Sequence, residues 1–238
     1  MKVYRADLHI HTCLSPCADL DMSPRKIVRR AADLGLDILG ISDHNTCDNV
    51  PALRGAAKGT ALIVLGGMEI CSREEVHLLG YFDADTDLFA VQAALHRKLQ
   101  DVGESSFRDD QVIANAEDEV LGFHEKLLIG AVDLSLQEIV DLVHRYHGLA
   151  VASHADREGF GILGQLGFIP PDLPLDGVEL RDPSSPLRGS LRLPLLTSSD
   201  AHHLEDMGRG VTRFTLGAPS VTEIGRALRR EGGRGTEF

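Results

Sequence analysis

Histidine and acidic residues recur near the ends of the apolar runs of this 238-residue sequence. His9 and His11 are separated by one residue in the first run, and Asp200 and His202 repeat this spacing near the C-terminus. Side chains at positions i and i+2 of a strand project to the same face, so each pair would point in one direction. Imidazoles and carboxylates are good ligands for divalent cations. The spacing therefore favours metal chemistry.

Four further candidates lie in or just after other apolar runs: His44, Glu69, His77 and His154. A single strand histidine such as His77 or His154 is more often a hydrogen-bonded core residue than a ligand. The joint pattern is stronger, because chance would not place so many ligand types at successive strand ends. Six histidines and at least two carboxylates at one place would need cations to offset and organise them.

The elements that would position these residues alternate between short apolar runs and longer helical patterns, which is typical of βα units around a mainly parallel sheet. A (β/α) barrel of this length is common, and the carboxyl ends of its strands meet at one mouth. We expect residues 1–238 to form a single domain. The expected strands cover residues 3–10, 37–44, 61–70, 75–82, 148–155, 176–181, 193–202 and 211–216.

Local signals delimit several helices. Ser23-Pro24 predicts a helix start and Gly35 its end, while Ser135 with Glu138 and Ser220 with Glu223 have the spacing of capping boxes. Residues 84–134 differ, because they contain two amphipathic helical patterns (88–100 and 108–127) and no clear strand. We expect a helical insertion there that covers one side of the barrel. Residues 230–238 are expected to form a loose tail.

Composition limits the partners. The formal net charge of −12 opposes long-range attraction to nucleic acid or to an anionic membrane, and Trp is absent. We therefore expect a small phosphorylated substrate, and neither long nucleic acid nor a membrane as a partner. The N-terminus lacks the apolar core of a signal peptide and no apolar run of about 18 residues follows, so a cytoplasmic protein is expected. A disulfide framework is then not expected for the four cysteines, and we expect at least three of them to be buried thiols.

The ordered motifs resemble the PHP family (polymerase and histidinol phosphatase), and they span residues 7–202 in that family's order. The resemblance implies a distorted (β/α)7 TIM-like barrel with a site of two to three divalent metal ions (Mn, Zn or Fe) that hydrolyses phosphate esters. The residues that carry the resemblance are Asp7-Leu8-His9-Ile10-His11-Thr12, Ile41-Ser42-Asp43-His44-Asn45, Gly67-Met68-Glu69-Ile70, Val76-His77-Leu78-Leu79-Gly80-Tyr81, Ala152-Ser153-His154 and Ser198-Ser199-Asp200-Ala201-His202.

Carried over residue by residue, the family's ligands would form three metal positions. The first would use His9, His11, Glu69 and Asp200, the second Glu69, His77 and His154, and the third His44, His202 and one residue of the loop after His11. That loop departs from the family, which usually has an acid or histidine where this chain has Pro16 and Cys17. We favour Asp19, because a hard carboxylate suits manganese or magnesium, whereas the Cys17 thiolate would favour zinc. Asp21 is a weaker alternative.

In this interpretation Glu69 and Asp200 are the catalytic carboxylates. A carboxylate shared by two metals roughly 3.5–4 Å apart would let them hold a bridging hydroxide that attacks phosphorus. Arg157, shortly after His154, and Arg181, after the 176–181 strand, are candidates for binding the phosphate. The alternative for both is a salt bridge at the barrel rim.

The sequence thus predicts a metal-dependent phosphoesterase that hydrolyses small phosphate monoesters or nucleotide-sized diesters. An amidohydrolase is disfavoured. Amidohydrolases with two metals usually bridge them with a modified lysine at a strand end, and none of the five lysines of this sequence ends an expected strand. Two alternatives remain open: an exonuclease-type hydrolase acting on nucleic acid, and a metal-binding regulatory module with weak or no catalysis.

Overall fold

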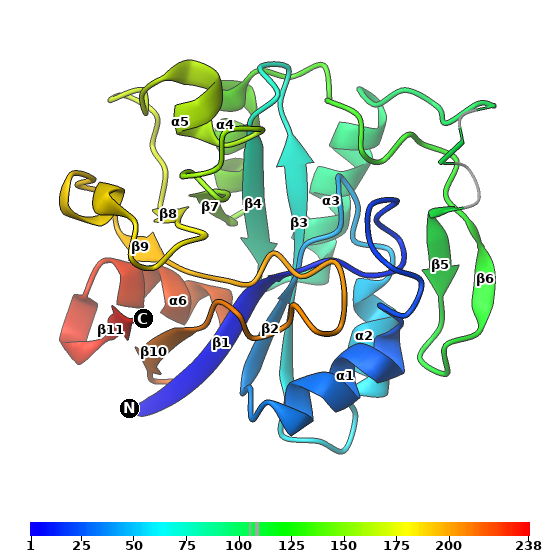
Figure 1. Cartoon of the computed structure of the whole chain (residues 1–238), viewed down its shortest axis with the longest axis horizontal. Coiled ribbons are helices and arrows are strands. Elements are labelled where there is room, and N and C mark those ends of the chain that lie inside the picture. The colour runs from blue at the N-terminus through cyan, green and yellow to red at the C-terminus, as the bar shows by residue number, and fades with distance from the viewer. Residues whose placement is uncertain (105, 108–109) are drawn as a thin grey trace.

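The computed structural model describes residues 1–104, 106–107 and 110–238. A nine-stranded sheet has the order β11-β10-β1-β2-β3-β4-β7-β8-β9, and a separate two-stranded sheet is formed by β5 and β6 (Figure 1). The strands of the large sheet are β1 (Lys2–Ile10), β2 (Ile38–Ile41), β3 (Ile63–Cys71), β4 (His77–Phe82), β7 (Leu149–Ala152), β8 (Gly177–Glu179), β9 (Leu195–Leu196), β10 (Thr212–Leu216) and β11 (Gly235–Glu237).

The sheet is curved and nearly closed, and helices surround it (Figure 1). Helices α1 and α2 lie at the lower right of the view, and α4 and α5 lie at the upper left. The helices are α1 (Pro24–Asp33), α2 (Val50–Ala56), α3 (Asp85–His96), α4 (Leu136–Arg145), α5 (Ile162–Leu166) and α6 (Val221–Leu228), with 3₁₀ turns η2 (Pro186–Gly189) and η3 (Glu231–Gly233). The predicted fold class, an α/β distorted barrel, is confirmed. No helix among the described residues is both long and apolar enough to cross a bilayer.

All eight predicted strands form, but β4 runs antiparallel to both of its neighbours, β3 and β7. Only residues 72–76 connect β3 to β4, and a parallel connection would need a crossover of a dozen or more residues. The reversal changes how one ligand reaches the mouth. His77 is the first residue of β4 and pairs with Cys71 at the end of β3, so it lies at the same edge as the ends of the parallel strands.

A hydrophobic cluster fills the concave side of the sheet. It joins side chains of β1, β2, β3, β4, β7, β9 and β10 with helix α6, including Leu8, Leu65, Tyr81, Val151 and Phe214. A flat sheet could not bring these side chains into one cluster, so the sheet must curl around them. A second and larger cluster lies between the sheet and the surrounding helices.

Strand β1 changes the face that its side chains present. Ala6 and Leu8 belong to the inner cluster, whereas Ile10 belongs to the outer one. The pairing register with β2 shifts between Asp7 and Ile10, where an irregularity interrupts the strict alternation. Because of this shift His9 faces inward just beyond Leu8. Irregularities of this kind often redirect side chains beside active sites.

Helix boundaries follow the sequence signals at α1 and α4. Helix α1 begins at Pro24, and Ser135 and Glu138 form the predicted capping box at the start of α4. At α6 only one of the two hydrogen bonds of the predicted capping box forms: the Ser220 side chain accepts from the Glu223 N–H. The Glu223 carboxylate does not bond back to Ser220, because it accepts from the Gly217 N–H and pairs with Arg234. The tail is not loose, since β11 pairs with β10.

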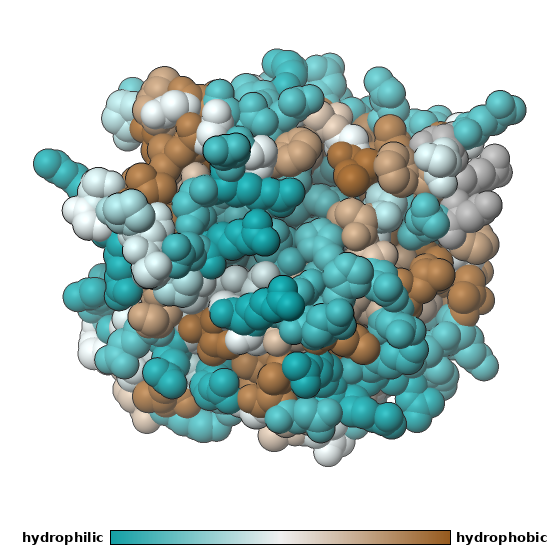
Figure 2. Space-filling model, in the orientation of Figure 1, coloured by the Kyte–Doolittle hydropathy of each residue, from teal (hydrophilic) through white to brown (hydrophobic). Residues whose placement is uncertain are grey.

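The predicted insertion at 84–134 is only partly helical. The first helix forms as α3, which packs against β3 and β4. Where a second helix was predicted over 108–127, strands β5 (Val112–Ala114) and β6 (Val120–Phe123) form a hairpin, and residues 108–109 lie outside the described residues. The Asn115 side chain accepts from the backbone N–H groups of Glu117 and Glu119, and this local turn competes with a helix. The exposed side chains of β6 add to the apolar surface on this side of the molecule (Figure 2).

Candidate metal centre

All of the predicted ligands except Asp19 come together at one mouth of the barrel. His9 lies near the end of β1, and His44 follows β2. Isolated parallel bridges join His44 to Glu69 and Ile10 to Ala201, so the loops after β2 and β9 continue the sheet and carry their ligands to the centre. His9, His11 and Glu69 are at most 1% exposed. The centre therefore lies below the surface of the mouth.

Glu69 lies between two groups of histidines. Its Oε1 atom is 3.0 Å from His77 Nδ1, 3.1 Å from His154 Nε2 and 3.4 Å from His9 Nε2. Its Oε2 atom is 3.3 Å from His44 Nδ1 and 3.4 Å from His11 Nε2. The two oxygens thus face different ligand sets, as a carboxylate that bridges two cations must.

Asp200 faces one histidine from each of these groups. Its Oδ1 atom is 3.3 Å from His9 Nε2 and 3.5 Å from His11 Nε2, and those two nitrogens are 3.1 Å apart. The four residues predicted for the first metal position are therefore adjacent. Asp200 and His154 both have positive φ angles, of 52° and 25°, which non-glycine residues rarely adopt. Such strained backbone is concentrated at functional sites.

Several buried polar atoms of the centre lack hydrogen-bond partners among the described residues. They are Nδ1 of His44, Nδ1 of His77, both ring nitrogens of His154, and Oδ1 of Asp200. Buried polar atoms are nearly always satisfied, so such a group of orphans needs an explanation. Together with Glu69 they offer the nitrogen and oxygen donors that divalent cations take. The residues present therefore fit such cations.

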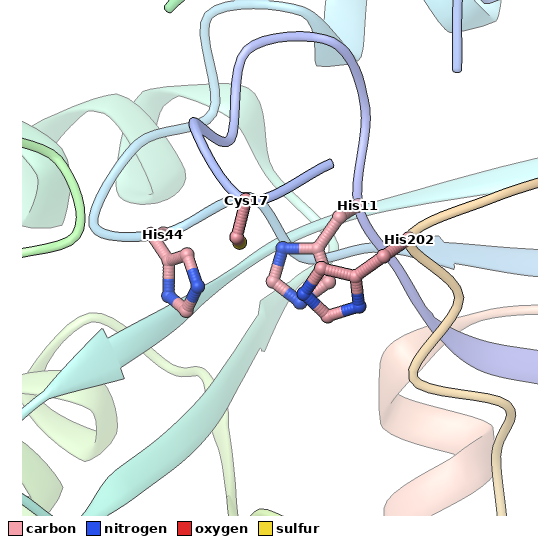
Figure 3. Close-up of side chains that lie close together, drawn as sticks. All are labelled: His11, Cys17, His44 and His202. Carbon is pink, nitrogen blue, oxygen red and sulfur yellow. The ribbon is translucent and has the colours of Figure 1, made fainter. Parts of the chain in front are cut away.

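At the third predicted position, Cys17 rather than Asp19 lies beside the histidines. Ligand atoms of His11, Cys17, His44 and His202 all lie within 4.8 Å of one another, and Figure 3 shows the thiol directed between the imidazoles. Asp19 is directed away, with its carboxylate 48% exposed and 3.7 Å from His203 Nδ1. Asp21 pairs with Lys26 at the surface.

Backbone geometry explains this placement. Ser15 accepts from the Ala18 N–H and Asp19 donates its N–H to the His202 carbonyl, so a tight turn sends the Cys17 side chain inward. Ligand hardness alone favoured Asp19, and the loop conformation could not be deduced from the sequence.

The charges in the centre shift its pKa values in opposite directions. Burial would raise the pKa of Glu69, but His77 and His9 outweigh it and hold that pKa well below its usual range. Burial would lower the pKa of His11, but Asp200 and Glu69 raise it to about 9. Burial, aided by the charge of His11, lowers the pKa of His202 to about 4. In the metal-free protein, protons on some histidines thus offset the carboxylates.

Residues behind the ligands orient them. The His11 Nδ1 atom is 2.9 Å from Ser15 Oγ, and that hydroxyl donates to Asp43 Oδ1 at 2.7 Å. Asp43 also accepts from the Thr12 N–H and hydroxyl. The sequence analysis did not predict these supporting roles. The sequence contained one signal for such a role, because the acidic residue Asp43 directly precedes His44 at the end of an expected strand.

A cavity of about 480 Å³ opens beside the centre. Arg157, Arg181, Asp200, His202 and Arg209 are among its lining residues. Arg157 Nη1 is 3.6 Å from Asp200 Oδ2, so this arginine lies both at the rim and next to a ligand. Arg157 and Arg181 were predicted to lie here. Arg209 was not, because no motif marks it.

An aromatic ring borders the centre itself. Phe160 lines a smaller cavity of about 110 Å³ that also includes Glu69 and His77. Its ring stacks on the His77 imidazole at a centroid distance of 4.5 Å and remains 36% exposed. Its φ is 62°, an unusual value for a bulky residue.

Comparison with known proteins gives both sequence and structural relatives. A 79-residue stretch is 35% identical to the 5'-3' exoribonuclease Rnm of Salmonella typhimurium and covers 31% of this chain and 26% of that protein. Endonuclease Q from Pyrococcus furiosus has a TM-score of 0.73 at 19% identity, with 99% of this chain and 58% of that chain covered. An endonuclease Q complex with a 27-mer duplex that has an abasic lesion at the active site has a TM-score of 0.69 at 20% identity, with 98% and 58% covered.

A putative metal-dependent phosphoesterase from Bifidobacterium adolescentis has a TM-score of 0.55 at 21% identity, with 83% of this chain and 87% of that chain covered. This chain thus spans only about a quarter of the exoribonuclease and little more than half of the endonuclease.

The expectation that long nucleic acid is excluded as a partner is wrong. Similar proteins are exoribonucleases, and the endonuclease complex holds a DNA duplex. The net charge of −12 misled the prediction, because it is summed over the whole surface. Three arginines are concentrated in the cavity, and local potential rather than net charge governs an anionic ligand there.

Two protein-family models match this chain. Residues 7–162 match the model described as PHP domain, and residues 187–231 match the one described as PHP-associated. The first match contains every predicted ligand except Asp200 and His202. The chain belongs to the PHP domain family of metal-dependent phosphoesterases.

Proposed function

We propose that this chain hydrolyses phosphodiester bonds of nucleic acid, using two to three divalent cations held at the barrel mouth. The observation that carries the proposal is the position of Glu69 between the ligands of the first two predicted metal positions: its Oε1 atom faces His77, His154 and His9, and its Oε2 atom faces His11 and His44. A shared carboxylate is the central feature of two-metal phosphoesterase sites. Bound cations would lower the pKa of water and stabilise charge on the phosphoryl oxygens.

The ligand sets divide among three positions. His9, His11, Glu69 and Asp200 would hold one cation, Glu69, His77 and His154 a second, and His44, His202 and Cys17 a third. With a thiolate and imidazoles, the third position favours zinc or iron over magnesium. Cys17 is exposed as a residue, but its thiol is directed towards the histidines, where partial loss of solvent and the Glu69 charge raise the pKa of Cys17 to about 12, so cation binding must displace the thiol proton.

The cavity beside the centre supports an anionic substrate. Its arginines outnumber its aspartates by three (Arg157, Arg181, Arg209) to two (Asp200, Asp206). Guanidinium groups match phosphate oxygens in bidentate geometry. A volume of about 480 Å³ lies in the range of small-ligand pockets. We expect one nucleotide of the substrate to occupy it, with the scissile phosphate at the metals.

Phe160 supports a nucleotide in particular. One face of its ring is covered by His77, and the ring is still partly exposed at the edge of the centre. An aromatic ring in this position can stack on a base of any sequence, at roughly 1–3 kcal/mol per base. Phosphate binding by arginines and stacking by Phe160 together favour a nucleotide chain over a simple phosphate.

The test is hydrolysis by the full chain loaded with manganese, zinc or iron in turn. Labelled single-stranded RNA and DNA, the matching duplexes, a mononucleotide and an aryl phosphate are compared, and Glu69→Gln purified in parallel controls for contaminating nucleases. We expect chelator-sensitive cleavage of the oligonucleotides, with a kcat/KM above that for the mononucleotide. Turnover of monoesters with intact oligonucleotides would contradict the proposed substrate. No turnover with any metal would point to a regulatory module.

A further inference from the structure

Glu179, the last residue of β8, lies directly behind two of the metal ligands. Its side chain is 1% exposed. The Oε1 atom accepts from His9 Nδ1 at 3.0 Å and from the backbone N–H of His154 at 3.1 Å. The Oε2 atom is buried and has no hydrogen-bond partner among the described residues. One carboxylate oxygen thus contacts ligands that belong to two different metal positions.

The contact with His9 fixes which ring nitrogen is free. With a proton on Nδ1 held by Glu179, the Nε2 lone pair faces Glu69 and Asp200, at 3.4 and 3.3 Å. Metal-binding histidines typically donate their second N–H to a carboxylate in this way, which fixes the tautomer and strengthens the ligand. The contact with His154 holds its backbone where φ is 25°, outside the usual range.

Ser153 is a second and weaker acceptor for His9 Nδ1. Its hydroxyl lies 2.7 Å from Glu69 Oε1, to which it donates, and 3.4 Å from His9 Nδ1. The hydroxyl proton is donated to Glu69, and the oxygen can accept from His9 Nδ1 only at 3.4 Å, compared with 3.0 Å for the Glu179 carboxylate. Among the described residues, Glu179 is the only one whose carboxylate lies within hydrogen-bond distance of His9 Nδ1.

The fold keeps this carboxylate although its Oε2 atom is buried without a partner among the described residues, which is costly. Removing the carboxylate would also leave the His9 Nδ1–H and the His154 N–H without their acceptor, so stability and metal affinity must be measured separately. We propose that Glu179 is a positioning residue for the metal centre, which sets the His9 tautomer and the His154 backbone as ligands. The inference rests on the metal centre of the proposed function, and it does not depend on which phosphoester is the substrate.

The test separates metal affinity from stability. Three metal-free proteins are compared: wild type, Glu179→Gln and Glu179→Leu. Each is titrated with Co²⁺, monitored by visible absorption, and with Zn²⁺ in competition with a chelator of known affinity. Thermal unfolding of the metal-free proteins is measured in parallel. Glu179→Leu should bind metal about 10–100-fold more weakly and show an altered Co²⁺ spectrum. Glu179→Gln keeps an acceptor oxygen and should lie between it and wild type. Metal-free Glu179→Leu should melt below wild type, because two buried donors lose their acceptor, but it should remain folded at the temperature of the titration, and Glu179→Gln should melt closer to wild type.

Glu223→Gln is the matched control, because this acid serves α6 and Arg234 far from the ligands. It should lower the melting temperature and leave metal affinity unchanged. Metal affinities of both Glu179 variants within about twofold of wild type would overturn the inference, as would losses that only follow unfolding of the metal-free protein. If Glu179→Leu does not fold, the metal affinity of Glu179→Gln decides whether the inference holds. Failure of the proposed function would appear differently, as a wild type that binds metal normally and cleaves no nucleic acid.

Discussion

The Nε2 atoms of His9 and His11 lie 3.1 Å apart, and the Nδ1 atoms of both rings are engaged elsewhere, with Glu179 and Ser15. Both Nε2 atoms therefore face a common point that Glu69 and Asp200 also face. In the metal-free protein, protons on these histidines balance the two carboxylates. In the metal-loaded protein a cation would replace the protons on these two histidines.

Replacing Glu69 should disrupt the centre more than any other single change. Glu69→Gln removes the negative charge and points an amide N–H₂ group at histidine nitrogens, so it cannot bridge cations. We expect bound metal to fall by at least one equivalent and kcat/KM to fall at least about 100-fold, or about 2.7 kcal/mol. Elemental analysis and kinetics check this. Glu75→Gln, in the exposed β3–β4 turn, is the control and should match wild type.

Cys17 and Asp19 can be distinguished by paired substitutions. Cys17→Ser replaces a thiolate that faces three imidazoles, so zinc at the third position should bind at least roughly tenfold more weakly. Asp19→Asn changes an exposed carboxylate and should leave zinc affinity within about twofold. Zinc titration of the two proteins gives the answer. The reverse order of effects would make Asp19 the ligand.

The pH dependence of the metal-free protein should reflect His11. Its pKa is raised from 6.5 in the unfolded chain to about 9 in the folded protein, so the stabilisation is fully present below pH 6.5 and is lost as pH rises through 9. A shift of this size corresponds to at most about 3 kcal/mol.

Glu69 and Asp200, whose pKa values are depressed, stay charged throughout that window and do not add to the slope. Urea unfolding of metal-free protein between pH 6 and 9.5 should therefore show falling stability, while zinc affinity should rise as protons cease to compete. Burial would lower the pKa of His9, but Glu179, Glu69 and Asp200 outweigh it and raise that pKa as well. Stability that is flat or rising over this range would therefore mean that neither His9 nor His11 is protonated in the metal-free centre.

The cavity arginines should act on substrate binding. Arg157→Ala and Arg181→Ala each remove a guanidinium that would contact phosphate already in the ground state, so KM for an oligonucleotide should rise roughly tenfold with kcat changed less than about threefold. Arg213→Ala, exposed on β10 away from the cavity, is the control. A fall in kcat at constant KM would instead assign these arginines to the transition state.

Much of the fold and ligand set could be predicted because both depend on local pattern. Apolar runs marked the eight strands, and His9, His11 and Glu69 stand where such runs end. Properties set by tertiary geometry could not be predicted. The reversal of β4 depends on a short connection, and the inward direction of Cys17 depends on hydrogen bonds to Ser15 and His202. Glu179 looked like an ordinary strand residue, since nothing in the sequence shows which side chain lies behind His9.

Anomalous diffraction from crystals of the zinc-loaded protein, recorded on both sides of the zinc absorption edge, tests the central claim most directly. The account predicts at least two peaks flanking Glu69, one beside His9, His11 and Asp200 and one beside His77 and His154. A third peak is predicted between Cys17, His44 and His202. A single peak that does not contact Glu69, or no peak at this mouth, would contradict the account.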